Sequence, residues 1–141
     1  MATKTTSAIN GTGSALANTI TGSAGNNILS GLGGDDTLIG GQGNDRLDGG
    51  NQNDILKFGN NFGADTVVGF DTVARSGQDK LDVSDLGITA ANFDQRITIS
   101  SPTRADTLVT VHDSGGITVG TILLLGIAAR TVDETDFNLS A

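Results

Sequence analysis

Short carboxylate side chains are the residues of this sequence whose type and setting best suit chemistry. Fifteen of the sixteen acidic residues are Asp, and Glu134 is the only Glu. Glu would supply surface charge as well as Asp does, so a preference for the shorter carboxylate in glycine-rich surroundings indicates turns and oxygen ligands for a hard cation. The sequence has no Cys, which excludes disulfides and zinc sites built on thiolates.

The Asp residues of the first half follow a nine-residue spacing. In five consecutive copies, position one is Gly, position six is Asn or Asp, and position eight is Ile or Leu. The copies span 13–21, 22–30, 31–39, 40–48 and 49–57, and a degenerate sixth copy spans 60–68 after a two-residue insertion. Position six holds Asn18, Asn27, Asp36, Asp45, Asp54 and Asp65. Three columns of fixed residue type over five copies indicate a repeat architecture.

Each copy is suited to a tight turn followed by a short strand. Glycine adopts the positive φ angles of such turns at low steric cost, and a three-residue strand places one side chain inward. Two copies complete one coil, so copies eighteen residues apart stack on the same side. We therefore expect an all-β chain that begins with a right-handed parallel β-roll of two sheets. Its inner rows are expected to hold Ile20, Leu29, Leu38, Leu47, Leu56 and Val67.

This core is too thin to stabilise a glycine-rich roll alone. Six aliphatic side chains must offset the conformational entropy of roughly fifty residues, and the stacked turns bring Asp carboxylates close to like charges. A bound cation would neutralise those carboxylates. Ca²⁺ fits best, because it accepts about six to eight oxygen ligands from carboxylates and carbonyls in flexible geometry.

The second half of the sequence has the alternating pattern of short antiparallel strands. A Ser-Gly-Gly sequence at 114–116 turns the chain between two of them, which predicts a hairpin over 106–125. We also expect one helical turn at 89–93 and a capping box from Thr131 to Glu134. The expected strands are 80–84, 96–100, 106–113 and 117–125. The expected divisions are a flexible tail or linker at 1–12, the roll at 13–68 and a small C-terminal antiparallel β cap at 69–141.

The repeat resembles the GGxGxDxUx nonapeptide of the RTX family, the hemolysin-type calcium-binding repeat, in which U is a large aliphatic residue. The copy at 40–48, GGQGNDRLD, matches every specified position. Residues 62–71 and 79–84 are similar to the C-terminal regions of RTX proteins. The resemblance covers the repeats over 13–68 and implies a calcium-binding module of a type I-secreted protein.

The resemblance also implies which residues bind calcium. An RTX ion lies between two turns on the same side of the roll and binds carbonyls and position-six side chains from both. The first site would use Leu32, Gly34, Asp36, Gly49, Asn51 and Asp54, and the second Ser23, Gly25, Asn27, Gly40, Gln42 and Asp45. A third would use Gly41, Gly43, Asp45 and Asp65, and a fourth Gly31, Gly33 and Asp36 with Ser14, Leu16 and Asn18. Leu16 and Asn18 depart from the pattern, and Asp71 or Asp82 could complete a site beyond Asp54. We expect about three to five Ca²⁺ ions.

The same resemblance implies export from a Gram-negative cell by the type I secretion machinery, through an uncleaved C-terminal signal within 69–141. The first residues lack the apolar stretch of a cleavable signal peptide, which agrees with this route. The module would stay unfolded in the calcium-poor cytosol and fold outside the cell, where binding energy becomes folding energy. We thus expect a secreted, extracellular protein whose partners are calcium ions, the secretion machinery and an upstream domain of a parent protein.

Two alternatives remain open. One is an accessory, substrate-binding module of a polysaccharide-modifying enzyme similar to the alginate epimerases, and the other is a stalk or cap of an RTX adhesin or toxin. A net charge of −8 argues against strong binding to a polyanion. The eight Lys and Arg residues are scattered, so nucleic acid is not an expected partner, and no apolar stretch reaches the ~20 residues of a membrane span. No hydrolase, P-loop or metalloprotease motif occurs, so we expect no catalytic residues and no enzyme activity.

Overall fold

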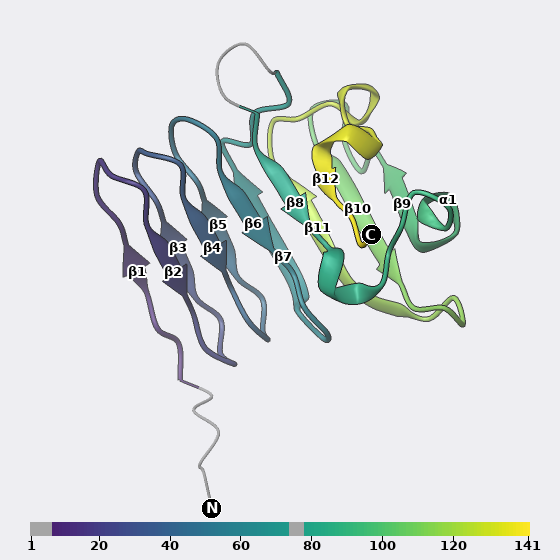
Figure 1. Ribbon diagram of the computed structural model, residues 1–141, viewed down its shortest axis with the longest axis horizontal. Helices are drawn as coiled ribbons and strands as arrows, with labels where there is room; N and C mark the ends of the chain where they lie inside the picture. Colours follow the sequence, from purple (N-terminus) through teal and green to yellow (C-terminus); the bar gives the residue numbers. More distant parts are fainter. Residues whose placement is uncertain (1–6, 74–77) are drawn as a thin grey trace, which may run out of the picture.

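Short strands alternate between two sheets along the first half of the chain (Figure 1). The computed structural model describes residues 7–73 and 78–141. One sheet contains β1 (Gly11–Thr12), β3 (Ile28–Ser30) and β5 (Arg46–Asp48), and the other contains β2 (Thr19–Thr21), β4 (Thr37–Ile39) and β6 (Ile55–Lys57). Strands eighteen residues apart pair in parallel, which aligns Leu29 with Leu47 and Leu38 with Leu56. The predicted parallel β-roll is confirmed.

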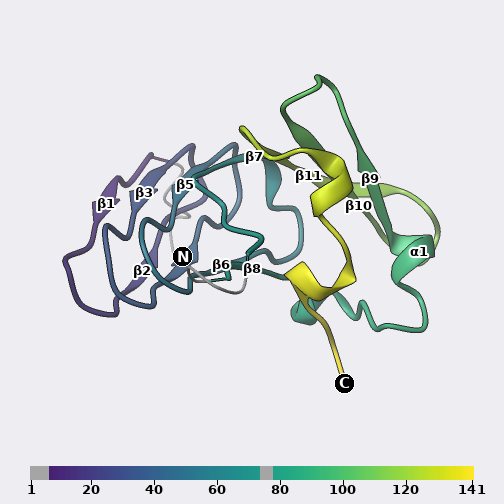
Figure 2. The same cartoon turned by 90° about the horizontal axis from the view of Figure 1, so that it is seen from above.

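Each nine-residue copy places one aliphatic side chain between the two sheets. Figure 2 looks roughly down the strands and shows β1, β3 and β5 facing β2 and β6 across the interior of the roll. Ile20 lies on β2, the edge strand of its sheet, and is only partly buried. The other predicted inner residues are at most 1 % exposed: Leu29, Leu38, Leu47, Leu56 and Val67. The inner rows are thus the predicted ones.

The second half of the chain extends both sheets. Its strands are β7 (Gly63–Val68), β8 (Lys80–Asp82), β9 (Ile97–Ser100), β10 (Thr107–His112), β11 (Thr118–Leu124) and β12 (Phe137–Asn138). β7 pairs in parallel with β5 and β11, and β10 and β9 then continue that sheet in antiparallel order. β8 pairs in parallel with β6, and β12 with β8. The predicted antiparallel hairpin is confirmed, and its sheet is continuous with the roll.

Two aromatic side chains join the core before β7, Phe58 from the two-residue insertion and Phe62 from the sixth copy. Phe58 and Phe62 are each 1 % exposed, and their rings meet edge to face at 5.1 Å. Gly120 of β11 leaves the space that the Phe62 ring fills, because a β-carbon there would lie 2.5 Å from the ring. Phe62 therefore packs the end of the roll against β11.

Two local features differ from the sequence predictions. β1 pairs with β3, so the sheet begins within the tail predicted at 1–12. Helix α1 spans Phe93–Arg96 and not 89–93. The reason is a turn before the helix, where Asn92 Oδ1 accepts the Thr89 N–H at 2.9 Å. Within the described ranges no helix is both long enough and apolar enough to cross a lipid bilayer.

The capping box predicted from Thr131 lies two residues further along the chain. The N–H of Asp133 donates to Asp136 Oδ2 at 3.0 Å, around the 3-10 helix η3 (Glu134–Asp136). Thr131 is not free to cap, because it ends the 3-10 helix η2 (Ala129–Thr131) and its hydroxyl donates to a backbone carbonyl at 2.7 Å. The prediction of this box was wrong in its residues.

Candidate metal centre

The position-six side chains form two columns, held together by hydrogen bonds between stacked turns. The first column follows the turns that lead into β2, β4 and β6. The N–H of Asn18 donates to Asp36 Oδ1 at 2.6 Å, and the N–H of Asp36 donates to Asp54 Oδ1 at 2.9 Å. The N–H of Asp54 donates to Asp79 Oδ1 at 3.0 Å. The first column therefore consists of Asn18, Asp36, Asp54 and Asp79.

The second column follows the turns that lead into β3, β5 and β7. The N–H of Asn27 donates to Asp45 Oδ1 at 2.7 Å, and the N–H of Asp45 donates to Asp65 Oδ1 at 2.8 Å. Asp65 lies twenty residues after Asp45 and not eighteen, so the column continues across the insertion. The structure thus brings the predicted position-six residues together within each column.

Three aspartates in these columns each have one carboxylate oxygen with no hydrogen-bond partner among the described residues. The exposed fractions of Asp36, Asp45 and Asp54 are 1, 3 and 0 %. The Oδ2 atom of each has no hydrogen-bond partner among the described residues. Removing an ionised carboxylate from water costs several kcal/mol unless charge or hydrogen bonds compensate. The three oxygens therefore require a cation or a proton.

Gly31 shows that carboxylate and carbonyl oxygens from successive turns meet at one place. A β-carbon at Gly31 would lie 2.1 Å from Asp36 Oδ2 and 2.4 Å from the carbonyl oxygen of Gly49. Likewise, a β-carbon built at Gly40 would lie 2.2 Å from Asp45 Oδ2. No group of three His, Cys, Asp or Glu side chains that could hold a metal ion occurs within the described residues, and each turn contributes at most one carboxylate to its column. A cation here must bind carbonyl oxygens as well, and Ca²⁺ does so.

Carbonyl oxygens of positions two and four also lie between stacked turns. The Leu32 oxygen lies 2.4 Å from a β-carbon built at Gly50, and the Gly43 oxygen lies 2.0 Å from one built at Gly63. Leu32 and Gln52 occupy these positions with φ angles of 77° and 81°, a conformation that non-glycine residues adopt at a cost. Two more backbone carbonyl oxygens lie in the same way. The Ser23 oxygen is close to a β-carbon built at Gly41, and the Gly25 oxygen is close to one built at Gly43.

The remaining predicted ligands lie on the same turns. Gly33 and Asn51 form an isolated parallel bridge between stacked turns, and the Leu32 carbonyl accepts the Asn51 N–H at 3.2 Å. Gly34 has a φ angle of 95°, and Gln42 lies half-buried at position three of its turn. The position-one residues Gly31, Gly40 and Gly49 are buried.

Comparison with known proteins agrees with this arrangement. The model of the RTX calcium-binding nonapeptide repeat (4 copies) matches residues 12–47 and, one copy further along, 21–56. The chain carries RTX calcium-binding repeats. The solution structure of the AlgE6R3 subunit of the Azotobacter vinelandii mannuronan C5-epimerase is similar, with 25 % identity and a TM-score of 0.69 over 92 % of this chain and 77 % of that one. The AlgE6R2 subunit has 28 % identity and a TM-score of 0.61 over 92 % of both chains. The comparison with curated protein sequences found no match.

Four carboxyl groups of the columns have a raised pKa, because burial favours their protonated form. Burial raises the pKa of Asp65 to about 7. It raises the pKa of Asp54 and of Asp79 to about 6, and repulsion from Asp79 contributes to the rise at Asp54. Burial also raises the pKa of Asp45, although the hydrogen bond from the Asn27 N–H opposes this effect. A cation bound beside these groups would favour the ionised form instead.

The two Asn turns of the roll differ from the Asp turns. Asn27 Oδ1 accepts the Ser23 N–H at 2.6 Å, and Asn27 Nδ2 donates to Ser23 Oγ at 3.1 Å. Asn18 Oδ1 accepts the Ser14 N–H at 2.6 Å. These turns satisfy their position-six oxygen internally, whereas the Asp turns at Asp36, Asp45 and Asp54 leave one oxygen without a partner.

Asp79 is the column residue that sequence reasoning missed. The sequence suggested that Asp71 or Asp82 could complete a site beyond Asp54, and in the structure Asp79 accepts the Asp54 N–H. Asp82 Oδ1 instead accepts the N–H and hydroxyl of Ser84, at 3.0 and 2.6 Å. The N–H of Asp71 donates to Asp79 Oδ2 at 2.9 Å. A spacing of twenty-five residues lies outside the nine-residue period, so the period could not identify Asp79.

Position-five side chains form an outer ladder beside the columns. Asn26 Oδ1 accepts the Asn44 N–H at 2.9 Å, and Asp35 Oδ1 accepts the Asn53 N–H at 3.1 Å. Asn53 Oδ1 in turn accepts the Gln78 N–H at 2.9 Å. The signal for this ladder was present in the sequence, since position five is Asn or Asp in four consecutive copies.

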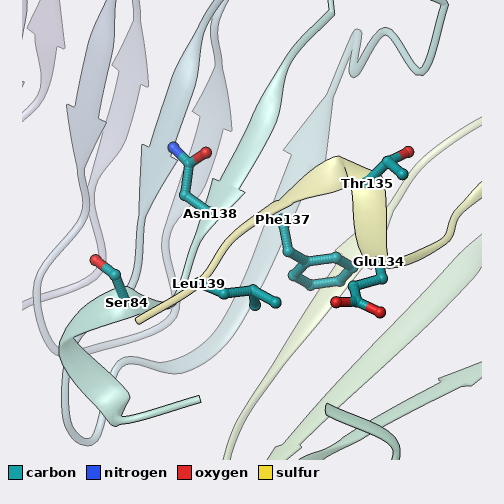
Figure 3. A pocket seen from close by; sticks show the side chains of 6 residues that line it. All are labelled: Ser84, Glu134, Thr135, Phe137, Asn138 and Leu139. Atoms are coloured by element: carbon teal, nitrogen blue, oxygen red, sulfur yellow. The ribbon is translucent and has the colours of Figure 1, made fainter. Parts of the chain in front are cut away.

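A pocket at the C-terminal end of the molecule offers no comparable chemistry. It has a volume of about 710 Å³ and lies between the 3-10 helix η1 (Ser84–Leu86), η3 and β12 (Figure 3). The Ser84 hydroxyl there donates to Asp82, and the lining includes no His or Lys that could act as its base. The lining residues are Ser84, Glu134, Thr135, Phe137, Asn138 and Leu139. The two columns are therefore the candidate functional site.

Proposed function

We propose that this RTX module folds around Ca²⁺ ions that occupy the gaps between stacked Asp turns. The observation that supports the proposal is the set of three buried Oδ2 atoms, on Asp36, Asp45 and Asp54, that have no hydrogen-bond partner in the described part of the chain. Calcium would neutralise these carboxylates and accept the carbonyl oxygens beside them. Because the gaps exist only when the turns are stacked, the free energy of ion binding contributes to folding.

Two of the proposed ions lie within the repeats. One is held by Asp36 and Asp54, with the carbonyl groups of Leu32 and Gly49. The other is held by Asp45 and Asp65, with the carbonyl group of Gly43. The further ligands that we propose for these two ions are Gly34, Gly41 and Asn51. In each case one turn supplies the unpartnered oxygen and the next turn supplies its own carboxylate.

We propose that the sites that depend on an Asn turn bind calcium more weakly than the sites between two Asp turns. The Asn27 oxygen already accepts a hydrogen bond from its own turn, and an amide carries no charge to attract a cation. The predicted site at Ser23, Gly25, Asn27, Gly40 and Gln42 would therefore contribute little to calcium-driven folding. The same holds for the predicted site at Asn18, Gly31 and Gly33. The first two turns would instead close the end of the roll without metal.

The proposed biological role follows from the coupling of folding to calcium. The chain would pass the type I secretion machinery of a Gram-negative cell while unfolded, because the cytosol contains little free calcium. It would fold outside the cell, where calcium is abundant, and there support an upstream domain of its parent protein. This role is non-catalytic and extracellular.

Circular dichroism during calcium titration tests the proposed function. In excess chelator the strand signal of the roll is expected to disappear, and Ca²⁺ should restore it in one cooperative transition. Mg²⁺ is the matched control, because it retains its water ligands and should not restore the signal at equal concentration. An unchanged spectrum in chelator, after elemental analysis shows that the metal has left, would contradict the proposal.

A second candidate function is an accessory module of a polysaccharide-modifying enzyme. The similarity to two subunits of a mannuronan C5-epimerase, over 92 % of this chain, favours it. The net charge of −8 opposes strong binding to an acidic glycan unless bound calcium offsets it. Isothermal calorimetry with mannuronan oligomers in calcium tests this candidate: heat of binding supports it, and no heat at millimolar oligomer contradicts it.

A further inference from the structure

We propose that the first column ends in a calcium site formed by Asp54 and Asp79, which binds the C-terminal region to the roll. This site lies beyond the matched repeats, because Asp79 is outside residues 12–56. The inference rests on the proposed function, since it assumes that calcium also fills the other gaps between stacked Asp turns. Each such gap, with the two turns that border it, is called a rung below. It assigns one ion to residues that are twenty-five positions apart in the sequence.

The unpartnered oxygen of Asp54 points to a ligand in the next rung. Asp54 is fully buried, and its Oδ2 has no hydrogen-bond partner among the described residues. It lies against Gly49, 2.3 Å from a β-carbon built there, as Asp36 Oδ2 lies against Gly31. The Asp36 oxygen meets a carbonyl of the following turn of its column. By the same geometry, the Asp54 oxygen serves the rung that follows, and that rung contains Asp79.

Asp79 occupies the position-six place of a turn, although no nonapeptide surrounds it. Its Oδ1 accepts the Asp54 N–H at 3.0 Å, as Asp54 Oδ1 accepts the Asp36 N–H. It precedes Leu81 by two residues, as Asp54 precedes Leu56, and Leu56 and Leu81 are paired across β6 and β8. Asp79 is 2 % exposed. The pairing of β8 with β6 therefore puts the buried carboxylate of Asp79 where position six of a further nonapeptide copy would lie.

The neighbouring cationic side chain does not neutralise the two carboxylates. The Lys80 ammonium donates to the Thr135 carbonyl, while the Lys80 N–H donates to the Asp54 carbonyl at 2.8 Å. A cavity of about 490 Å³ beside this place is lined in part by Asp54, Gln78 and Lys80.

A calcium ion in this rung would join three parts of the chain. Asp54 belongs to the fifth copy, and Asp79 directly precedes β8, which pairs with β12 on its other edge. Asp71 adds a third connection, because its N–H donates to Asp79 Oδ2 at 2.9 Å. Calcium binding would thus fix the C-terminal strands of this sheet on the roll, in addition to stacking the repeats.

Long-wavelength anomalous diffraction from crystals grown in Ca²⁺ tests the site in the unmodified protein. We expect anomalous peaks in the Asp36–Asp54 and Asp45–Asp65 rungs and a further peak in contact with both Asp54 and Asp79. Peaks in the first two rungs with none at Asp79 would overturn this inference alone. No peaks in any rung would mean that the proposed function itself fails.

Native mass spectrometry of two matched variants provides the second measurement. Asp79→Asn should bind one Ca²⁺ fewer than the unmodified chain, because it replaces a carboxylate ligand with an amide of the same shape. Asp82→Asn, two residues away on β8, should bind the full number, since Asp82 pairs with Ser84. Equal ion counts in Asp79→Asn and the unmodified chain would contradict the site. If Asp79→Asn fails to fold, the anomalous map decides.

Discussion

Asp54 is expected to be the aspartate whose replacement most reduces the response of stability to calcium. It is fully buried, and in our account it contacts two ions, one shared with Asp36 and one shared with Asp79. Asp54→Asn preserves the shape of the side chain and an oxygen to accept the Asp36 N–H. It removes the charge and replaces the unpartnered oxygen with an amide group. The sequence alone predicts that Asp45 bridges two ions, but the side-chain oxygen of Asn27, its partner in one of those sites, already accepts a hydrogen bond within its own turn.

The magnitude follows from the number of ions. An ion that binds only the folded chain adds about 1.4 kcal/mol of stability for each tenfold rise in free calcium above its dissociation constant. Three ions, on Asp36–Asp54, Asp45–Asp65 and Asp54–Asp79, therefore give a slope of about 4 kcal/mol per tenfold rise. Asp54→Asn leaves one complete site, so its slope should fall to about 1.4 kcal/mol.

Leu56→Ala is the matched control, because it lies in the same nonapeptide and is 1 % exposed. Its cavity should cost about 2–5 kcal/mol at every calcium concentration without changing the slope. A roughly three- to fifteen-fold rise in calcium should therefore offset it. The assay is urea unfolding, followed by circular dichroism at a series of buffered calcium concentrations. If Asp54→Asn and the unmodified chain give parallel lines, the bridging role of Asp54 is refuted.

Two further predictions concern protons and glycine. Since burial raises the pKa of Asp65 to about 7 and of Asp54 to about 6, above the unfolded value of 3.8, the folded chain without calcium holds protons that the unfolded chain has released. Acidification from pH 8 to pH 6 should therefore favour the calcium-free folded state over the unfolded chain, and circular dichroism in excess chelator that shows no gain of strand signal at pH 6 would contradict this. Gly31→Ala should abolish most of the calcium response, because its β-carbon would take the space between Asp36 Oδ2 and the next turn. Gly33→Ala, in the same turn, meets no atom closer than 3.9 Å and should titrate like the unmodified chain; a normal titration of Gly31→Ala would refute the placement of the ion.

Much of the roll could be predicted because its rules are local. A side chain at position eight of every copy must face inward, and the paired rows of Leu29 with Leu47 and Leu38 with Leu56 follow from that period alone. The position-six residues were likewise predictable, since one turn repeats at one spacing. The difference between Asn and Asp turns was also visible in the residue types, but the hydrogen bond that satisfies Asn27 required the structure.

The parts that could not be predicted depend on contacts between distant segments. Asp79 enters the first column because β8 pairs with β6 in one register, and no local pattern specifies that pairing. The capping box moved from Thr131 to Asp133 for a similar reason, since Thr131 is used by the preceding 3-10 helix. Sequence periodicity therefore describes the interior of the repeat and fails where the repeat meets the rest of the chain.

Amide hydrogen exchange measured by NMR tests the central claim most directly. The amides of Asn27, Asp36 and Asp45 donate to the carboxylates of the next rung, so their protection reports the stacking of the Asp turns. The account predicts slow exchange of these amides in calcium and exchange close to that of an unfolded chain in excess chelator. Equal protection in both conditions, once the metal is shown to have left, would contradict the claim that calcium binding drives the folding of this roll.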